Sequence, residues 1–148
     1  MNPASEHWIA RTIKQTADEH SELLAKTRAI ESLVEGMHYP PPGDVARKLR
    51  ALAEHLAAHI DEEEKSPLYT TVPEKVPELR DEIALRRGEH VPLMIALRQL
   101  TVEAERAHDA SMASALGMRI RSAVAAIRQH EAGESSILHR LRELDALD

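Results

Sequence analysis

The sequence predicts an all-α protein with one domain, residues 1–148, folded as an antiparallel up-down-up-down four-helix bundle. Three observations support this fold class. Ala, Leu, Glu and Arg dominate the composition and favour helices, whereas Phe is absent, Trp occurs once and Tyr twice. Proline and glycine are sparse, and the prolines cluster at a few breaks. Each segment between these breaks carries one apolar stripe at helical spacing.

The breaks divide the chain into four helices. A run of prolines at residues 40–42 must end the first helix, and three prolines between residues 67 and 77 mark a longer connection. A weaker third break lies where Asp109 or Ser111 is suited to cap the next helix. Pro92 should kink the third helix or mark where its regular part begins. The expected helices span about residues 5–37, 44–66, 78–107 and 111–146.

Each expected helix gathers its apolar residues on one face. Four amphipathic helices joined by three short connections favour a bundle, because each stripe must be buried against the others. The stripes contain Ile13, Ala17, Leu24, Thr27, Ile30 and Val34; then Val45, Leu49, Leu52 and Leu56; then Ile83, Met94, Leu97 and Thr101; and finally Leu116, Ile120, Val124, Ile127, Ile137, Leu141 and Leu144.

Size, charge and cysteine content exclude several classes of protein. A chain of 148 residues is the size of one domain with a substantial core. No stretch is long and apolar enough to span a bilayer, and residues 1–11 do not resemble a signal peptide. The absence of cysteine excludes disulfides, thiolate-bound zinc and iron–sulfur clusters, and suits a reducing cytoplasm. A net charge of −6 with mixed signs argues against nonspecific binding to nucleic acid or anionic membranes.

Every apolar stripe continues through a histidine, and two of them continue through a glutamate. At about 100° per residue, each glutamate shares the inward face of the histidine one turn before it. Counted from the helix ends, the histidines of each antiparallel helix pair are level to within about one turn. The six residues are His20 in the first helix, His59 and Glu63 in the second, His90 in the third, and His130 and Glu134 in the fourth.

This arrangement points to metal binding. An ionised carboxylate in an apolar interior is costly unless it is paired or binds a metal, and the stripes carry no inward Lys or Arg to neutralise Glu63 and Glu134. Two metal ions would neutralise both glutamates, with the carboxylates bridging and the imidazoles as terminal ligands. Imidazole and carboxylate without thiolate suit iron, manganese or zinc, and redox chemistry would favour iron.

The motifs around these six residues resemble the hemerythrin-like family of HHE cation-binding domains. The matching segments are DEHSELL around His20, HIDEEEKSPLY from His59, GEHVPLM around His90 and HEAGESSIL from His130. The resemblance covers nearly the whole chain in the order His, His-x3-Glu, His, His-x3-Glu. It implies a hemerythrin-like bundle in which the four histidines are terminal ligands and the two glutamates bridge two irons.

Two departures from the oxygen-carrying hemerythrins refine this expectation. Their third helix has a second histidine one turn along, where this chain has Met94, and their last carboxylate is an Asp five residues after its histidine rather than Glu134 at four. The resemblance is therefore closer to branches that react with or sense oxygen, peroxide or nitric oxide. His55, one turn before His59, is an alternative fifth histidine ligand.

Residues near the six have simpler interpretations. We expect His55 and Glu62 to support the ligands from the edge of the stripe, and Asp61 and Glu64 to face solvent. Gly133 is interpreted equally well as a tolerated glycine or as room for a small ligand. The remaining residues are expected to lie in ordinary packing, for Trp8, Tyr69 and Met94, or at the surface and helix ends, for His7, His38, His108 and His139.

Other helical architectures agree less well with the sequence. A ferritin-like site needs Glu-x-x-His on two helices, but the two instances, at residues 35–38 and 105–108, sit at helix ends. A histidine phosphotransfer bundle needs one exposed histidine rather than four buried ones.

The functional hypothesis is a cytoplasmic non-haem di-iron protein that binds, reacts with or senses oxygen, peroxide or nitric oxide. Whether it is an enzyme stays open, as do its electron donor and oligomeric state. The alternatives are iron storage or delivery, an oxygen-binding carrier, and a metal-free helical interaction module.

Overall fold

The computed structural model describes residues 3–35, 42–107 and 109–147, and these are helical almost throughout, without a strand. The all-α prediction is therefore confirmed. The second connection holds short helical turns rather than a plain loop. The long elements are α1 (Pro3–Glu35), α2 (Pro42–Lys65), α5 (Arg80–Gly88), α6 (His90–Arg106) and α7 (Ala110–Leu147), and the short ones are α3 (Pro67–Thr70), α4 (Val72–Lys75) and the 3-10 helix η1 (Pro77–Leu79).

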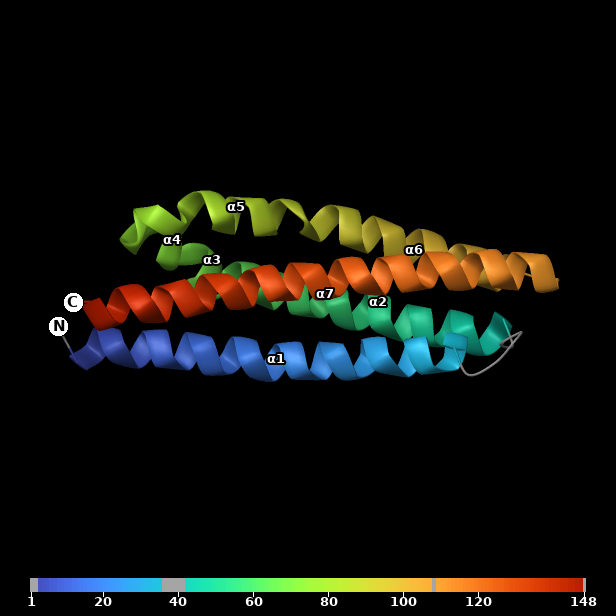
Figure 1. The fold of residues 1–148 in the computed structure, drawn as a ribbon, viewed down its shortest axis with the longest axis horizontal. Coiled ribbons are helices and arrows are strands. Elements are labelled where there is room, and N and C mark those ends of the chain that lie inside the picture. The colour runs from blue at the N-terminus through green and yellow to red at the C-terminus, as the bar shows by residue number, and fades with distance from the viewer. Residues whose placement is uncertain (1–2, 36–41, 108, 148) are drawn as a thin grey trace.

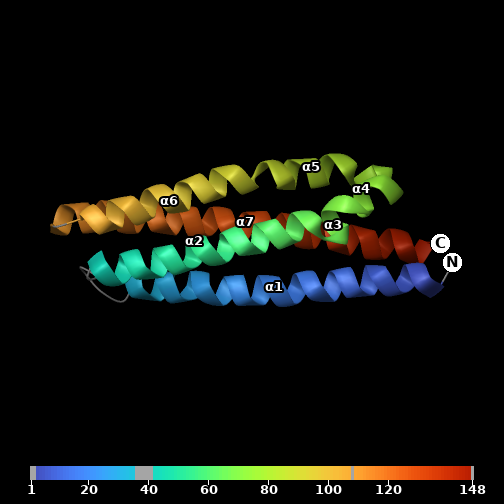
Figure 2. The ribbon, with the colours of Figure 1, turned by 180° about the vertical axis from the view of Figure 1, so that it is seen from behind.

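The long helices lie side by side along one axis. Figures 1 and 2 show α1 starting beside the C-terminal end of α7 and running to the opposite end of the molecule, from which α2 returns. Helices α5 and α6 follow one another in the same direction as α1, and α7 runs back. Helix α1 contacts α2 and α7, and α6 contacts the same two helices, so the four surround a common interior.

The third predicted helix, 78–107, is divided. Helix α5 ends at Gly88 and α6 begins at His90, four and two residues before Pro92. Pro92 has no N–H to donate to the Gly88 carbonyl, and its ring crowds that carbonyl, so a regular helix cannot continue across this point. Turn-like bonds join Glu89 N to Arg86 O at 3.1 Å and Leu93 N to Glu89 O at 3.2 Å. Pro92 thus marks where the regular helix begins, as the sequence indicated.

The other helix boundaries agree with the prediction to within two residues. Asp109 caps α7, because its Oδ1 accepts a hydrogen bond from the backbone N–H of Met112 at 2.8 Å. The break predicted from the first proline run falls largely on residues 36–41, outside the described residues. His38 and His108 also lie outside them, as does the side chain of His7.

The interior consists of two apolar clusters with a polar layer between them. Along α1, along the α5–α6 pair, along α7 and from α2 into α3, the histidine predicted as a ligand lies between buried residues of one cluster and residues of the other. The large cluster contains Leu23, Ile30, Leu49, Leu52, Leu56, Leu93, Leu97, Leu100, Ile120, Val124 and Ile127, among others, and the terminal cluster contains Leu68, Tyr69, Val72, Leu79, Ile83, Ile137, Leu138 and Leu141.

One predicted stripe is wrong in part. In α1, Leu23 rather than Leu24 is fully buried, and Ala17 is exposed. The buried row passes instead through Thr12, Thr16 and His20. Hydrophobicity alone favours Ala over Thr, so a row carrying threonines is easily assigned to the wrong face.

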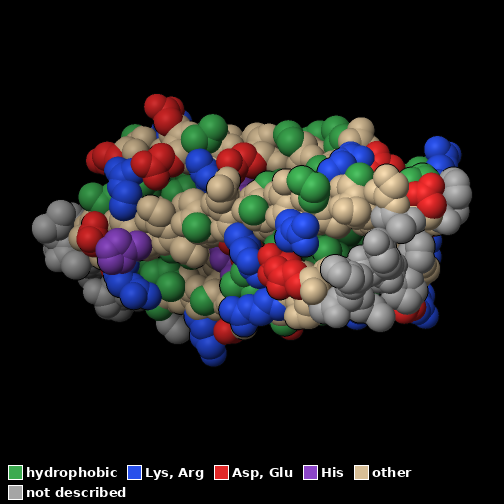
Figure 3. Space-filling model, turned by 45° about the vertical axis from the view of Figure 1, so that its right-hand side comes forward, with side chains coloured by type: hydrophobic (Ala, Val, Ile, Leu, Met, Phe, Trp, Pro, Cys, Tyr) green, Lys and Arg blue, Asp and Glu red, His purple; other side chains and the backbone are tan. Residues whose placement is uncertain are grey.

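The molecular surface carries charges of both signs. In the space-filling view, acidic and basic side chains are interspersed over the visible face (Figure 3). None of the described helices has the length and apolar character that a membrane crossing would need.

Leu97→Ala should destabilise the protein by about 2–5 kcal/mol, because Leu97 is 1% exposed and its truncation leaves a cavity in the large cluster. Ile95→Ala, on the same helix at 49% exposure, is the control and should change stability by less than about 0.5 kcal/mol. Urea unfolding of both variants measures the difference. Equal effects would show that α6 does not present this face to the interior.

Candidate metal centre

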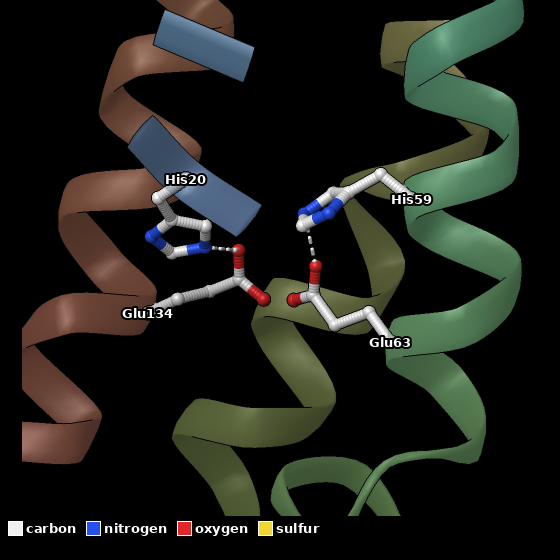
Figure 4. A group of neighbouring side chains, drawn as sticks. All are labelled: His20, His59, Glu63 and Glu134. Carbon is white, nitrogen blue, oxygen red and sulfur yellow. Dashed lines mark ion pairs between the residues drawn. The ribbon is translucent and has the colours of Figure 1, made fainter. Parts of the chain in front are cut away.

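Six polar side chains converge in the layer between the two apolar clusters. They come from four helices: α1, α2, α6 and α7. Figure 4 shows four of them, with His20 and Glu134 pointing towards His59 and Glu63 across the interior. All six predicted residues are brought together and buried, with exposed fractions of 6% for His20, 7% for His59, 2% for Glu63, 2% for His90, 3% for His130 and 0% for Glu134.

The side chains form two groups with two members in common. In each group, one nitrogen or oxygen atom from every residue lies within 4.8 Å of those of the others. Glu63 and Glu134 belong to both groups. One group is completed by His20 and His59, and the other by His90 and His130. Each group therefore offers two imidazoles and two carboxylates, and the carboxylates stand between the two pairs of imidazoles.

The inward atoms face one another closely. His20 Nε2 lies 3.3 Å from Glu134 Oε1, and His130 Nε2 lies 3.1 Å from the same oxygen. His59 Nε2 lies 2.5 Å from Glu63 Oε2. At these short distances the atoms do not have the geometry of hydrogen bonds.

Most of these inward atoms are buried without a hydrogen-bond partner. Buried polar atoms are normally satisfied, because leaving one without a partner costs free energy. A set of unpartnered nitrogen and oxygen atoms at one place fits a bound cation, which would satisfy them together. The unpartnered atoms are His20 Nε2, His59 Nε2, His130 Nε2, both carboxylate oxygens of Glu63 and Glu134 Oε1.

The electrostatics favour neutral imidazoles in two of the four histidines. Burial lowers the pKa of His20 and of His130, which leaves each ring with a free lone pair at neutral pH. Burial also acts to lower the pKa of His59, but the neighbouring carboxylates of Glu63, Glu19 and Glu131 together outweigh it, so this pKa is raised. A cation bound between His59 and Glu63 would replace that proton.

Carboxylates lie behind the outer nitrogens of three histidines. His90 Nδ1 lies 2.8 Å from Glu64 Oε1, and His130 Nδ1 lies 2.8 Å from Glu89 Oε1. His59 Nδ1 is 3.6 Å from Glu19 Oε2. An Nδ1–H that donates to a carboxylate fixes the tautomer with a lone pair on Nε2, the atom turned inward.

The prediction that Glu64 merely faces solvent is therefore wrong. Its side chain is 42% exposed, yet its carboxylate reaches His90 from α2. Helical periodicity places Glu64 off the inward stripe but cannot show that a ring on another helix lies within reach.

Tyr69 is a second residue whose role the sequence did not reveal. Its side chain packs in the terminal cluster, as expected, but its hydroxyl also donates a hydrogen bond to Glu134 Oε2 at 2.6 Å. The same hydroxyl lies 3.5 Å from His90 Nε2. Burial raises the pKa of Tyr69, so the phenol keeps its proton and remains a donor. Its place at the end of the HIDEEEKSPLY motif was the available signal.

Glu131 is a further buried carboxylate that the sequence analysis missed. It is 4% exposed, and neither of its oxygens has a hydrogen-bond partner. Burial raises the pKa of Glu131 to about 7, against the opposing effect of nearby His20 and His59. Glu131 follows His130 directly, about 100° around the helix, so the stripe that identified His130 did not include it.

The expected supporting residues lie farther out. Glu62 is exposed, and His55 is half-buried near Glu22 and Lys26. Among the described residues, neither joins a group of potential ligand atoms, so His55 does not take the place of a fifth histidine here. Asp61 is exposed and pairs with Lys65 at 3.0 Å. His139 lies at the surface as predicted and pairs with Glu143 at 3.1 Å.

The space beside Gly133 is filled by a side chain of α5. A Cβ atom at this position would lie 2.7 Å from Arg86 Cδ and 2.8 Å from Arg86 Cζ, and it would also collide with Nη1. The absent side chain therefore makes room for an arginine of α5 rather than for a small ligand.

Tyr69→Phe should destabilise the metal-free protein by about 1–3 kcal/mol, because Glu134 Oε2 would lose its hydrogen-bond donor. Thr70→Val is the control: it removes an exposed hydroxyl that bonds only the backbone of its own turn, and should cost less than about 0.5 kcal/mol. Urea unfolding measures both. If Tyr69→Phe were as stable as the parent, the hydrogen bond to Glu134 would contribute nothing.

Comparison with known proteins gives a family match for the first part of the chain. Residues 5–68 match the model of the hemerythrin HHE cation binding domain, a segment that spans α1 and α2 and contains His20, His59 and Glu63. Searches of curated proteins and of solved structures give no match. The resemblance predicted from the sequence is confirmed by this match: residues 5–68 are recognised as hemerythrin HHE cation binding domain.

Proposed function

We propose that the whole chain is a hemerythrin-like protein that binds two iron ions and, through them, a small ligand such as oxygen, peroxide or nitric oxide. In this proposal α1, α2, the α5–α6 pair and α7 are the four antiparallel arms of the family's bundle. The observation that carries the proposal is the pair of four-residue groups that share Glu63 and Glu134.

The shared glutamates support two cations rather than one. Each glutamate belongs to both groups, so its carboxylate lies within reach of both pairs of imidazoles. A single ion would leave one pair of histidines and several buried oxygens unsatisfied. Two ions would also provide positive charge, because none of the described residues buried in the layer is a Lys or an Arg.

The ligand chemistry narrows the metal to iron, manganese or zinc. Nitrogen and carboxylate oxygen are the available atoms, and cysteine is absent from the chain. We choose iron because the proposed ligands are redox-active. When bound, iron supplies the electrons that oxygen, peroxide or nitric oxide accepts.

The surrounding residues hold and shield the centre. Tyr69 orients Glu134 through its hydrogen bond, and Glu64 and Glu89 orient His90 and His130. The apolar clusters on both sides keep bulk water away, which protects reactive species from side reactions.

A groove gives a small molecule an approach from solvent. It has a volume of about 180 Å³, runs between α1 and α7 and has His20 in its lining. Its lining includes the small residues Ala17 and Ser135 and the polar residues His139 and Arg142. The groove has room for a ligand of a few atoms.

Met94 favours reaction or sensing over reversible oxygen carriage. It occupies the position where the carriers have a fifth histidine, and it packs half-buried against the large cluster.

Iron storage or delivery and an interaction module without metal remain alternatives. The module is disfavoured because it gives no account of the unpartnered atoms in the polar layer. The absence of cysteine supports a cytoplasmic location, and the electron donor remains to be identified.

Metal analysis of the purified protein tests the centre. We expect about two equivalents of iron in the parent, and loss of metal in Glu63→Ala and His130→Ala because each removes ligand atoms from the site. His55→Ala and His139→Ala are controls that should keep the parent's metal content. Retention of full metal in both site variants would overturn the assignment.

Exposure of the reduced protein separately to oxygen, peroxide and nitric oxide tests what the centre does. Repeated consumption of one ligand, followed with an electrode, would establish an enzyme. A stable change in the absorption spectrum without consumption would establish a sensor or carrier. Glu63→Ala is the control for adventitious iron. A parent whose loaded form gives neither response would contradict the proposed ligand chemistry.

A further inference from the structure

We propose that Arg86 is a positioning residue for His130, acting through Glu89, and that Gly133 is required because it leaves space for the Arg86 side chain. This inference rests on the proposed function, since His130 matters as a metal ligand. It adds three residues, Arg86, Glu89 and Gly133, that act on His130 from outside the six predicted ligands.

The chain of contacts is continuous. Arg86 Nη1 lies 3.1 Å from Glu89 Oε1, and His130 Nδ1 lies 2.8 Å from the same oxygen. One carboxylate oxygen is therefore ion-paired with the guanidinium and hydrogen-bonded to the imidazole. The Arg86 side chain is only 20% exposed and that of Glu89 35%, so the contacts are partly shielded from water.

The break between α5 and α6 brings these groups into reach. Glu89 lies between the two helices, at the interruption caused by Pro92, and its backbone N–H bonds the Arg86 carbonyl at 3.1 Å. This turn ties Arg86 and Glu89 to each other. Helix α5 itself packs on α7, the helix that carries both His130 and Gly133.

Gly133 completes the arrangement from α7. A Cβ atom there would overlap Arg86 Nη1 and would lie 2.7 Å from its Cδ and 2.8 Å from its Cζ. An Ala at 133 must therefore displace the guanidinium. A glycine inside a helix is otherwise unfavourable relative to Ala, so its presence here calls for such a reason.

The consequence is a fixed orientation of the His130 ring. Glu89 alone could rotate on its side-chain bonds, but the second contact from Arg86 holds its Oε1 opposite Nδ1. The Nδ1–H tautomer then leaves Nε2 free, 3.1 Å from Glu134 Oε1 and facing the cation position.

The first test is the rate at which iron is lost to a chelator. Gly133→Ala and Arg86→Ala should each speed the loss by about tenfold, the lower end of the effect of residues that orient metal ligands. Arg86→Lys, which keeps the positive charge, should recover part of the parent's behaviour. Gly43→Ala is the matched control, because a Cβ at Gly43 meets nothing within 4 Å.

The double variant Arg86→Ala/Gly133→Ala distinguishes this arrangement from general helix damage. Both substitutions remove the same contact, so the double variant should lose iron no faster than Arg86→Ala alone. A parent-like rate in Gly133→Ala, or a double variant whose rate is the product of the two single effects, would overturn the proposal.

A second test needs no metal and separates this inference from the proposed function. In metal-free protein, nitrogen NMR should show His130 as the fixed Nδ1–H tautomer in the parent and in Gly43→Ala. Gly133→Ala and Arg86→Ala should show a mixture of tautomers. Unchanged His130 signals in both would reject the role of Arg86, whereas a parent that binds no iron would reject the proposed function alone.

Discussion

The structure depends on the burial of two carboxylates, Glu63 and Glu134, in the middle of an apolar interior. Their exposed fractions are 2% and 0%, and neither is opposed by a buried Lys or Arg among the described residues of the layer. Such charges need compensation from hydrogen bonds, protons or cations. The Tyr69 hydroxyl and the neighbouring imidazoles provide part of it, and in the proposed function cations provide the rest. The apolar clusters on either side confine this polar chemistry to one level of the molecule.

Compensation continues outward in steps. Three of the four histidines, His59, His90 and His130, have other carboxylates behind them, and one of these carboxylates, Glu89, is paired with Arg86. Glu89 is more exposed than the ring it holds, at 35% against 3% for His130, so its charge costs less to desolvate, whereas Arg86 behind it is 20% exposed. The glycine at 133 and the helix break before Pro92 are backbone features that make the outermost step geometrically feasible.

Helical periodicity accounts for the features that could be predicted from the sequence. The helices and the six converging residues could be predicted, because spacing along a helix determines which side chains share a face. An interruption of the third helix near Pro92 could also be predicted, because proline lacks a backbone N–H. Contacts between helices could not be predicted in this way. Glu64, Tyr69 and Glu131 lie off the stripes or in short connecting helices, and their roles depend on which ring or carboxylate of another helix lies opposite. Leu23 was misassigned for a related reason, since the buried row of α1 includes threonines.

The polar layer also divides the hydrophobic interior into two compartments, one on each side of it. Adjacent core residues normally transmit cooperativity by direct packing, but here that transmission must cross buried polar atoms that lack hydrogen-bond partners. Cation binding would then join the two compartments into a single unfolding unit, so the ions of the proposed centre would also set how much of the protein unfolds at once.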